Sequence, residues 1–310
     1  MYDNPSDFWK NFRLGTELQI SGSFIYNGLY SLDHIEYFFH EHEVFEFLYS
    51  LSIGLERLEK IVVILSEHNE EIDQEEFEKT LITHNHLELL KRIKTKHTIN
   101  LGKQHIKLLQ FISDFYKRTR YSRYNLNSVY EKNQDLHGFV NFLKEELKVT
   151  EEKGIQPMLA NNVRVKKFIG KLVGKITTEL YELVRTETTR LKLFTHEIEY
   201  YSKAYKIFLA KEFTFEKERH LQKEILILLL SGKLDDGMTR LIKSIEPLPL
   251  ENYGSAEYIR FLMDMRNNSN ILDEVESVLE DEPMTKERIE QVSLIGRDDL
   301  FFPEEDEEII

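Results

Sequence analysis

Hydrophobic side chains recur at helical spacing along most of this 310-residue chain. They return every three or four residues, which places them on one face of an α-helix. The segment 44–65, VFEFLYSLSIGLERLEKIVVIL, is apolar around most of its circumference, as is typical of a helix in the middle of a bundle. The pattern predicts further helices over residues 17–39, 77–81, 85–93, 101–124, 135–148, 162–208 with one break, 215–230, 234–245, 256–265, 270–280 and 286–292. With no β-hairpin pattern and no internal repeat, the sequence predicts an all-α multi-helix bundle.

The strongest boundary signal lies at residues 149–158, VTEEKGIQPM, where charges, Gly154 and Pro157 occur together. It predicts a helical bundle over residues 1–150 and a second helical region over 158–297. These two regions form either one multi-helix bundle or two packed helical domains. The last residues, 298–310, form an acidic tail, DDLFFPEEDEEII.

The composition limits the chemistry. The chain has no cysteine, which excludes disulfides, thiolate nucleophiles and Cys-based zinc sites. The first fifteen residues lack the apolar core of a signal peptide, and the longest strongly apolar run, ILILLL at 225–230, is too short to span a bilayer. We therefore expect a cytoplasmic protein without a membrane partner. No phosphate-binding or dinucleotide-binding glycine motif is present, and we expect no cofactor.

The charge is unevenly distributed. A net charge of −14 argues against nucleic-acid binding by the whole surface, but residues 91–123 hold ten Lys or Arg against the single acid Asp114. Within them, YKRTRYSRY (116–124) interleaves cations with tyrosines. Guanidinium groups bind phosphates and aromatic faces stack on bases, so this segment is a candidate contact for single-stranded RNA. The candidate residues are Lys117, Arg118, Arg120, Tyr121 and Arg123. The alternative is that these cations pair with carboxylates of the same chain or of a second copy.

Two histidines flank Asn85 in the segment LITHNHLELLKRI (81–93). A metal site needs two nitrogens on one side and a further ligand, and the two-residue spacing of His84 and His86 suits a loop better than a helix. Asn85 can cap a helix, with Glu88 reaching back to it. A helix start is the favoured interpretation. A metal or nuclease site and a histidine that contacts a ligand without metal are the alternatives. Metal-dependent hydrolysis through His84 and the HEHE segment at 40–43 ranks last, so no metal is expected.

Three charges interrupt the most apolar helix: Glu56, Arg57 and Lys60. The i,i+4 spacing of Glu56 and Lys60 suits an ion pair. Charges in such a helix are either paired or line a groove.

Three segments resemble the bacterial HEPN group of nucleotide-binding helical bundles: LYSLSIGLERLEKIVVIL (48–65), HNHLELLKRI (84–93) and FYKRTRY (115–121). The resemblance covers about the first 125 residues. It implies an all-α bundle, often a dimer, associated with RNA cleavage, toxin–antitoxin pairs or antiphage defence. In members that cleave RNA, an Arg and a His separated by four to six residues act on the 2′-OH and the phosphate.

Arg92 with His97 and Arg190 with His196 have that spacing, which also arises by chance in a chain of this composition. The candidate catalytic residues are His84, His86, Arg190 and His196. Arg266 and Asn267 begin like the group's usual Arg–Asn form, but no histidine follows. The first hypothesis is an RNA-binding protein that cleaves RNA by metal-independent transesterification. The alternative is a non-catalytic helical scaffold or sensor that acts through protein contacts, as a homo-oligomer or with a partner. In either case the acidic tail could cover the basic face.

Overall fold

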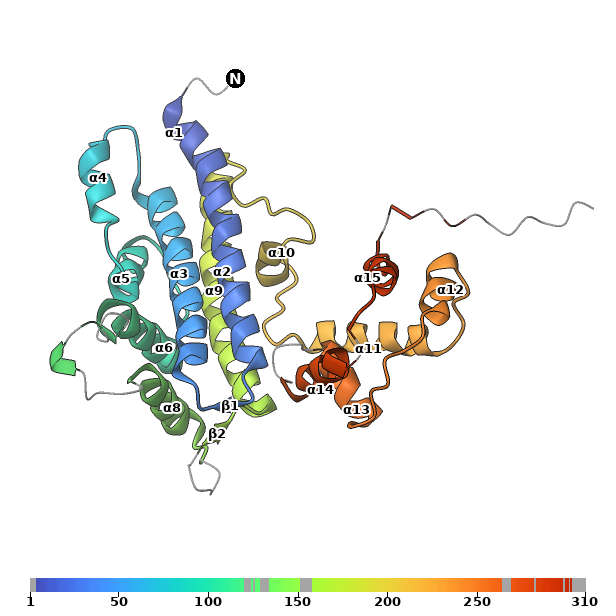
Figure 1. The fold of residues 1–310 in the computed structure, drawn as a ribbon. Helices are drawn as coiled ribbons and strands as arrows, with labels where there is room; N and C mark the ends of the chain where they lie inside the picture. The colour runs from blue at the N-terminus through green and yellow to red at the C-terminus, as the bar shows by residue number, and fades with distance from the viewer. Residues whose placement is uncertain are drawn as a thin grey trace, which may run out of the picture. The chain divides into compact units, whose positions relative to one another are not determined.

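The protein is all-α, as its sequence pattern predicts (Figure 1). The computed structural model describes residues 4–119, 124, 126–128, 134–150, 158–263, 269–281, 283–297, 299–300 and 302. Contacts divide the chain into two units, residues 1–215 and 216–310, which are described separately.

Two long helices, α2 (Leu14–His34) and α3 (Glu41–Glu67), lie side by side and form the centre of the first unit (Figure 1). Their backbones approach closely at Gly54, where an added Cβ would lie 2.7 Å from Cγ1 and 2.8 Å from the backbone nitrogen of Ile25. The Ser21 hydroxyl donates a hydrogen bond of 2.7 Å to the Gly54 carbonyl. A glycine is therefore required where the two helices meet.

Four further helices in the described part of this unit pack around α3. Helices α5 (His86–Lys96), α6 (Lys103–Asp114), α8 (Gln134–Leu147) and α9 (Val163–Leu191) all pack against it. This explains why α3 is apolar around most of its circumference. The other elements are α1 (Pro5–Phe8), the π-helical turn η1 (Trp9–Arg13), α4 (Gln74–Thr80), the π-helical turn η2 (Phe115–Thr119), the 3₁₀ turn η3 (Leu126–Ser128) and α10 (Lys203–Phe208), which packs against α2.

The first unit extends beyond the boundary expected from the sequence. Helix α9 packs on α3 and α6, so the segment 149–158 falls inside a unit that continues to Phe215. Residues 151–157 lie outside the described part of the chain. The predicted break within 162–208 is confirmed, because α9 ends at Leu191 and α10 begins at Lys203. The C-cap residue of α9, Lys192, has a left-handed φ of 57°.

A short antiparallel strand pair was not expected. Strand β1 (Tyr37–Phe38) pairs with β2 (Leu159–Ala160) at the end of the bundle where α9 begins (Figure 1). The helix expected over 17–39 consequently ends at His34. The Asn161 amide donates to the carbonyls of Leu32 (2.6 Å) and Ile35 (2.9 Å), and so satisfies carbonyl groups at the helix end.

The second unit contains α11 (Glu216–Leu230), α12 (Gly237–Ser244), α13 (Ser255–Met263), α14 (Ser269–Asp281) and α15 (Lys286–Ser293). Among its described residues only Ile271 and Glu274 are buried. Glu274 accepts hydrogen bonds from the backbone of Glu251 (2.9 Å) and Asn252 (2.8 Å) and from the Tyr258 hydroxyl (2.9 Å).

Within the described part of the chain, no helix combines the length and apolarity needed to cross a membrane.

Candidate functional site

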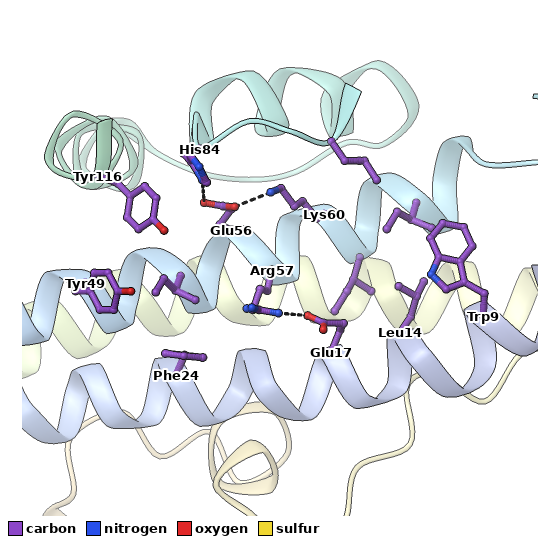
Figure 2. A pocket seen from close by; sticks show the side chains of 14 residues that line it. Trp9, Leu14, Glu17, Phe24, Tyr49, Glu56, Arg57, Lys60, His84 and Tyr116 are labelled. Atoms are coloured by element: carbon purple, nitrogen blue, oxygen red, sulfur yellow. Dashed lines mark hydrogen bonds and ion pairs between the residues drawn. The ribbon is translucent and has the colours of Figure 1, made fainter. Parts of the chain in front are cut away.

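A cavity of about 560 Å³ opens in the first unit between α2, α3, the segment before α5 and the start of η2 (Figure 2). Its polar wall consists of Glu17, Glu56, Arg57, Lys60 and His84. The three charges that interrupt the apolar pattern of α3 therefore line a hollow, one of the two roles that the sequence allowed them.

Glu56 holds a histidine and a lysine at once. Its Oε1 accepts a hydrogen bond from Nζ of Lys60 at 2.6 Å, and its Oε2 lies 2.9 Å from Nδ1 of His84 (Figure 2). The Glu56 side chain is 10% exposed and that of His84 is 49% exposed. An ionised carboxylate only accepts hydrogen bonds, so in the neutral ring Nδ1 carries the proton and Nε2 is the basic nitrogen. Glu56 thus orients His84 as a base.

Two tyrosines form an aromatic wall beside this histidine. The ring of Tyr116 lies 4.7 Å from that of His84, measured between centroids. Tyr49, from α3, stacks on Tyr116 with centroids 6.2 Å apart and an interplanar angle of 20° (Figure 2). Such a wall offers flat apolar surface next to an ionisable ring.

Arg57 completes the positive side of the cavity. It pairs with Glu17 of α2, and its guanidinium lies over the Phe24 ring, 5.9 Å from the centroid. Both cations of the cavity, Arg57 and Lys60, therefore have carboxylate partners from this chain. They remain partly exposed, so an incoming anion can reach them.

A second His–Glu pair lies next to the first but is buried. Nδ1 of His86 lies 2.7 Å from Oε2 of Glu59, and its Nε2 lies 3.2 Å from Oγ of Ser52. Both ionisable side chains are fully buried. The backbone N–H of His86 donates to the Ser113 hydroxyl at 2.9 Å. Burial raises the pKa of Glu59, whereas the His86 imidazole lowers it. This candidate catalytic residue therefore lies in the core, where it holds α5 against α3.

The start of α5 explains why both pairs form. Asn85 is its N-cap residue, with extended backbone, so His84 and His86 reach towards two carboxylates three residues apart on α3. The expected bond between Glu88 and the Asn85 backbone is absent. Instead, Oγ1 of Thr83 accepts from the Asn85 N–H at 3.2 Å and donates to Glu88 at 3.1 Å. Thr83 therefore accepts from the N-cap N–H in place of Glu88, and the Asn85 side chain makes no hydrogen bond to the helix end.

In each of the two Arg–His pairs with the RNase-like spacing, the arginine and the histidine have different hydrogen-bond partners. Arg190 binds Glu187 through Nε at 2.9 Å and Nη2 at 2.5 Å, whereas His196 contacts the Thr188 hydroxyl at 3.0 Å. Arg92 binds Glu67 through Nε at 3.2 Å and Nη2 at 2.6 Å. His97 lies 2.8 Å from the Ser66 hydroxyl and 3.6 Å from Glu187. Each of these two arginines pairs with a carboxylate of its own chain.

The basic-aromatic segment is described only at its beginning. Lys117 is exposed on η2, directly after the cavity residue Tyr116. The Arg118 side chain and residues Arg120, Tyr121 and Arg123 lie outside the described residues, as do Arg266, Asn267 and tail residues 303–310. In the part of the chain that is described, no group of three His, Asp or Glu side chains could hold a metal ion.

Sequence reasoning missed Tyr49 and the burial of His86, and it placed Tyr116 in the basic-aromatic segment without linking it to His84. The signal that did point to this place was the cluster of Glu56, Arg57 and Lys60 in an otherwise apolar helix. Fold and site define an all-α protein with a cavity lined by a Glu-held histidine, two cations and stacked tyrosines. No protein-family model matches the chain, and neither the curated proteins nor the solved structures contain a significant match.

Proposed function

We propose that the first unit binds single-stranded RNA at the cavity and that His84 acts on the bound phosphodiester. The observation that carries this proposal is the 2.9 Å contact between Glu56 Oε2 and His84 Nδ1, within a cavity that also presents Lys60, Arg57 and two tyrosines. The resemblance of the three sequence segments to RNA-cleaving helical bundles points to the same ligand.

The cavity contains the two kinds of group that bind a nucleotide. Tyr49 and Tyr116 offer faces on which a base can stack, and Arg57 and Lys60 offer donors to a phosphate. Its volume of about 560 Å³ lies within the range of small-ligand sites. Lys117, exposed just beyond Tyr116, extends the positive charge towards the rest of the basic segment. RNA affinity is therefore expected to fall with rising salt.

The oriented histidine suits transesterification. Nε2 of His84 removes the proton from the ribose 2′-OH, and the 2′-oxygen forms a bond to phosphorus. The bond from phosphorus to the 5′-oxygen breaks, and that oxygen takes a proton from water. The products are a 2′,3′-cyclic phosphate and a 5′-hydroxyl. Lys60 and Arg57 stabilise the negative charge that develops on the phosphate oxygens.

The proposal is tested with a fluorescein-labelled RNA oligonucleotide, by anisotropy for binding and by gel electrophoresis for cleavage. His84→Ala is expected to lower the cleavage rate by about 100-fold or more while binding changes little. Tyr116→Ala is expected to weaken binding by about tenfold, because a stacked base is lost. Arg185→Ala is the matched control, since the exposed Arg185 side chain pairs with Glu182 of the same helix, α9.

Two results would contradict the proposal: wild-type protein that does not bind RNA, or cleavage that persists in His84→Ala. Cleavage that is lost in Arg190→Ala and His196→Ala but kept in His84→Ala would place the reaction at the spaced Arg–His pair instead.

A non-catalytic scaffold is the second candidate function. It is supported by a separate observation, the exposed apolar surface of helix α11 in the second unit. A protein that binds no RNA but forms stable assemblies through that helix would favour this function.

A further inference from the structure

Helix α11 exposes apolar side chains that a stable protein normally covers. Six leucine and isoleucine side chains of this helix are between 44% and 71% exposed: Leu221, Ile225, Ile227, Leu228, Leu229 and Leu230. No residue of α11 is buried. Contiguous apolar surface of this kind marks an interaction site, whereas single exposed apolar residues do not.

The second unit also has too little core to explain its own folding. In the described part of residues 216–310, Ile271 is the one buried apolar residue. A unit of this size is stable only if it removes much of its apolar surface from water. A second chain that covers α11 would supply burial that the described part of this unit lacks, since α11 carries the largest run of exposed apolar side chains among the described residues.

The spacing within α11 fits a helix as its partner. Leu221, Ile225 and Leu228 follow each other at intervals of four and three residues, the spacing of a coiled-coil seam. Leu229, four residues after Ile225, broadens this stripe, whereas Ile227 and Leu230 lie on the other side of the helix.

The charges of α11 fit a second copy of itself. The chain as a whole carries −14, and two such chains repel each other. Over residues 216–230, however, three acids, Glu216, Glu218 and Glu224, are balanced by three bases, Lys217, Arg219 and Lys223. Two copies can therefore meet at this helix without net repulsion and with opposite charges beside the apolar stripe. A two-fold symmetric interface needs only this one surface, used twice.

We infer that α11 pairs with α11 of a second copy of this chain, so that the protein is a homodimer joined through its second unit. This inference is independent of the RNA site in the first unit.

Light scattering coupled to size exclusion, over a range of concentrations of the full chain, tests the pairing. The wild type is expected to run at twice the chain mass. Replacement of both Ile225 and Leu228 by Lys is expected to raise the dimer dissociation constant by at least 100-fold, with unchanged helix content by circular dichroism, because both side chains are exposed in the single chain. Leu262→Lys is the matched control: Leu262 is 70% exposed on α13 of the same unit, and its replacement is expected to leave the dimer intact.

The absence of native cysteine allows a second test that depends on no loss of function. Leu228→Cys is expected to give a disulfide-linked dimer under mild oxidation, whereas Leu262→Cys stays unlinked. A wild type that is monomeric at all concentrations would overturn the inference. So would a dimer that the double Lys variant does not weaken, or one in which Leu228→Cys does not cross-link. RNA binding is measured separately, so failure of the dimer leaves the proposed function standing.

Discussion

The two neighbouring His–Glu pairs of the first unit use the same elements for opposite purposes. His86 and Glu59 are fully buried, with Ser52 as a third partner, whereas His84 is half exposed and its partner Glu56 lines a cavity. One residue lies between the two histidines and two lie between the two glutamates, so one helix start contributes to both pairs. The difference in burial, and not the chemistry of the residues, makes one pair a structural anchor and the other a candidate reactive group.

The largest effect is expected from breaking the buried pair. Glu59→Ala leaves His86 without its partner in the core and is expected to lower the free energy of unfolding by about 3–5 kcal/mol. Glu56→Ala, the matched change at the cavity, is expected to cost about 1 kcal/mol, because water can replace the lost partner of His84. Urea unfolding measures both, and equal losses would contradict the contrast between the two pairs.

The pH dependence of the free energy of unfolding is a second test of the buried His86–Glu59 pair. Folding raises the pKa of Glu59, mainly because burial disfavours its charged form. The protonated carboxyl therefore stabilises the fold below its unfolded pKa of about 4.3, and this contribution is lost as the pH rises through the folded value. Glu59→Gln keeps the shape but cannot titrate. We expect the wild type to lose stability relative to Glu59→Gln as the pH rises from about 4, as measured by thermal melting across pH. A stability difference that stays constant with pH would show that folding does not raise the pKa of Glu59.

A smaller loss is expected at the third member of the buried group. Ser52→Ala removes the hydroxyl that lies 3.2 Å from Nε2 of His86 and is expected to cost about 1 kcal/mol. Ser66→Ala is the control, since its hydroxyl meets the partly exposed His97 at 2.8 Å, and it is expected to cost less. An equal cost at both serines would mean that burial of the histidine does not set the strength of its contact.

A change at Glu56, in the His84–Glu56 pair of the cavity, is expected to lower the rate of RNA cleavage and to leave the stability of the fold almost unchanged. Glu56→Gln can turn its amide NH₂ towards Nδ1 of His84 and so favour the tautomer with the proton on Nε2. That tautomer cannot act as the base, and we expect cleavage to fall by about 100-fold with RNA affinity and melting temperature nearly unchanged. A fall in affinity equal to the fall in rate would show that Glu56 serves binding rather than orientation of the histidine.

The sequence predicted the helices better than it predicted the site, for a physical reason. The apolar pattern of residues 44–65 sufficed to place α3 at the centre of the bundle, because the apolar faces of a helix are those that neighbouring helices cover. The interruption by Glu56, Arg57 and Lys60 similarly marked a groove or a set of pairs, and the structure shows both.

The burial of His86 could not be predicted in this way. A polar residue at a helix start is usually exposed, and only the positions of Glu59 and Ser52 on another helix make its burial possible. The stacking of Tyr49 on Tyr116 likewise joins residues far apart in sequence. Such contacts depend on how helices pack, which local patterns do not encode.

The most direct test of the central claim is a comparison of RNA cleavage by wild-type protein, His84→Ala and the control Arg185→Ala at equal concentration. We predict that the wild type and Arg185→Ala release a product with a 2′,3′-cyclic phosphate at similar rates and that His84→Ala releases it about 100-fold more slowly. Equal rates in all three proteins, or no product from any of them, would contradict the assignment of the cavity as a site of RNA cleavage.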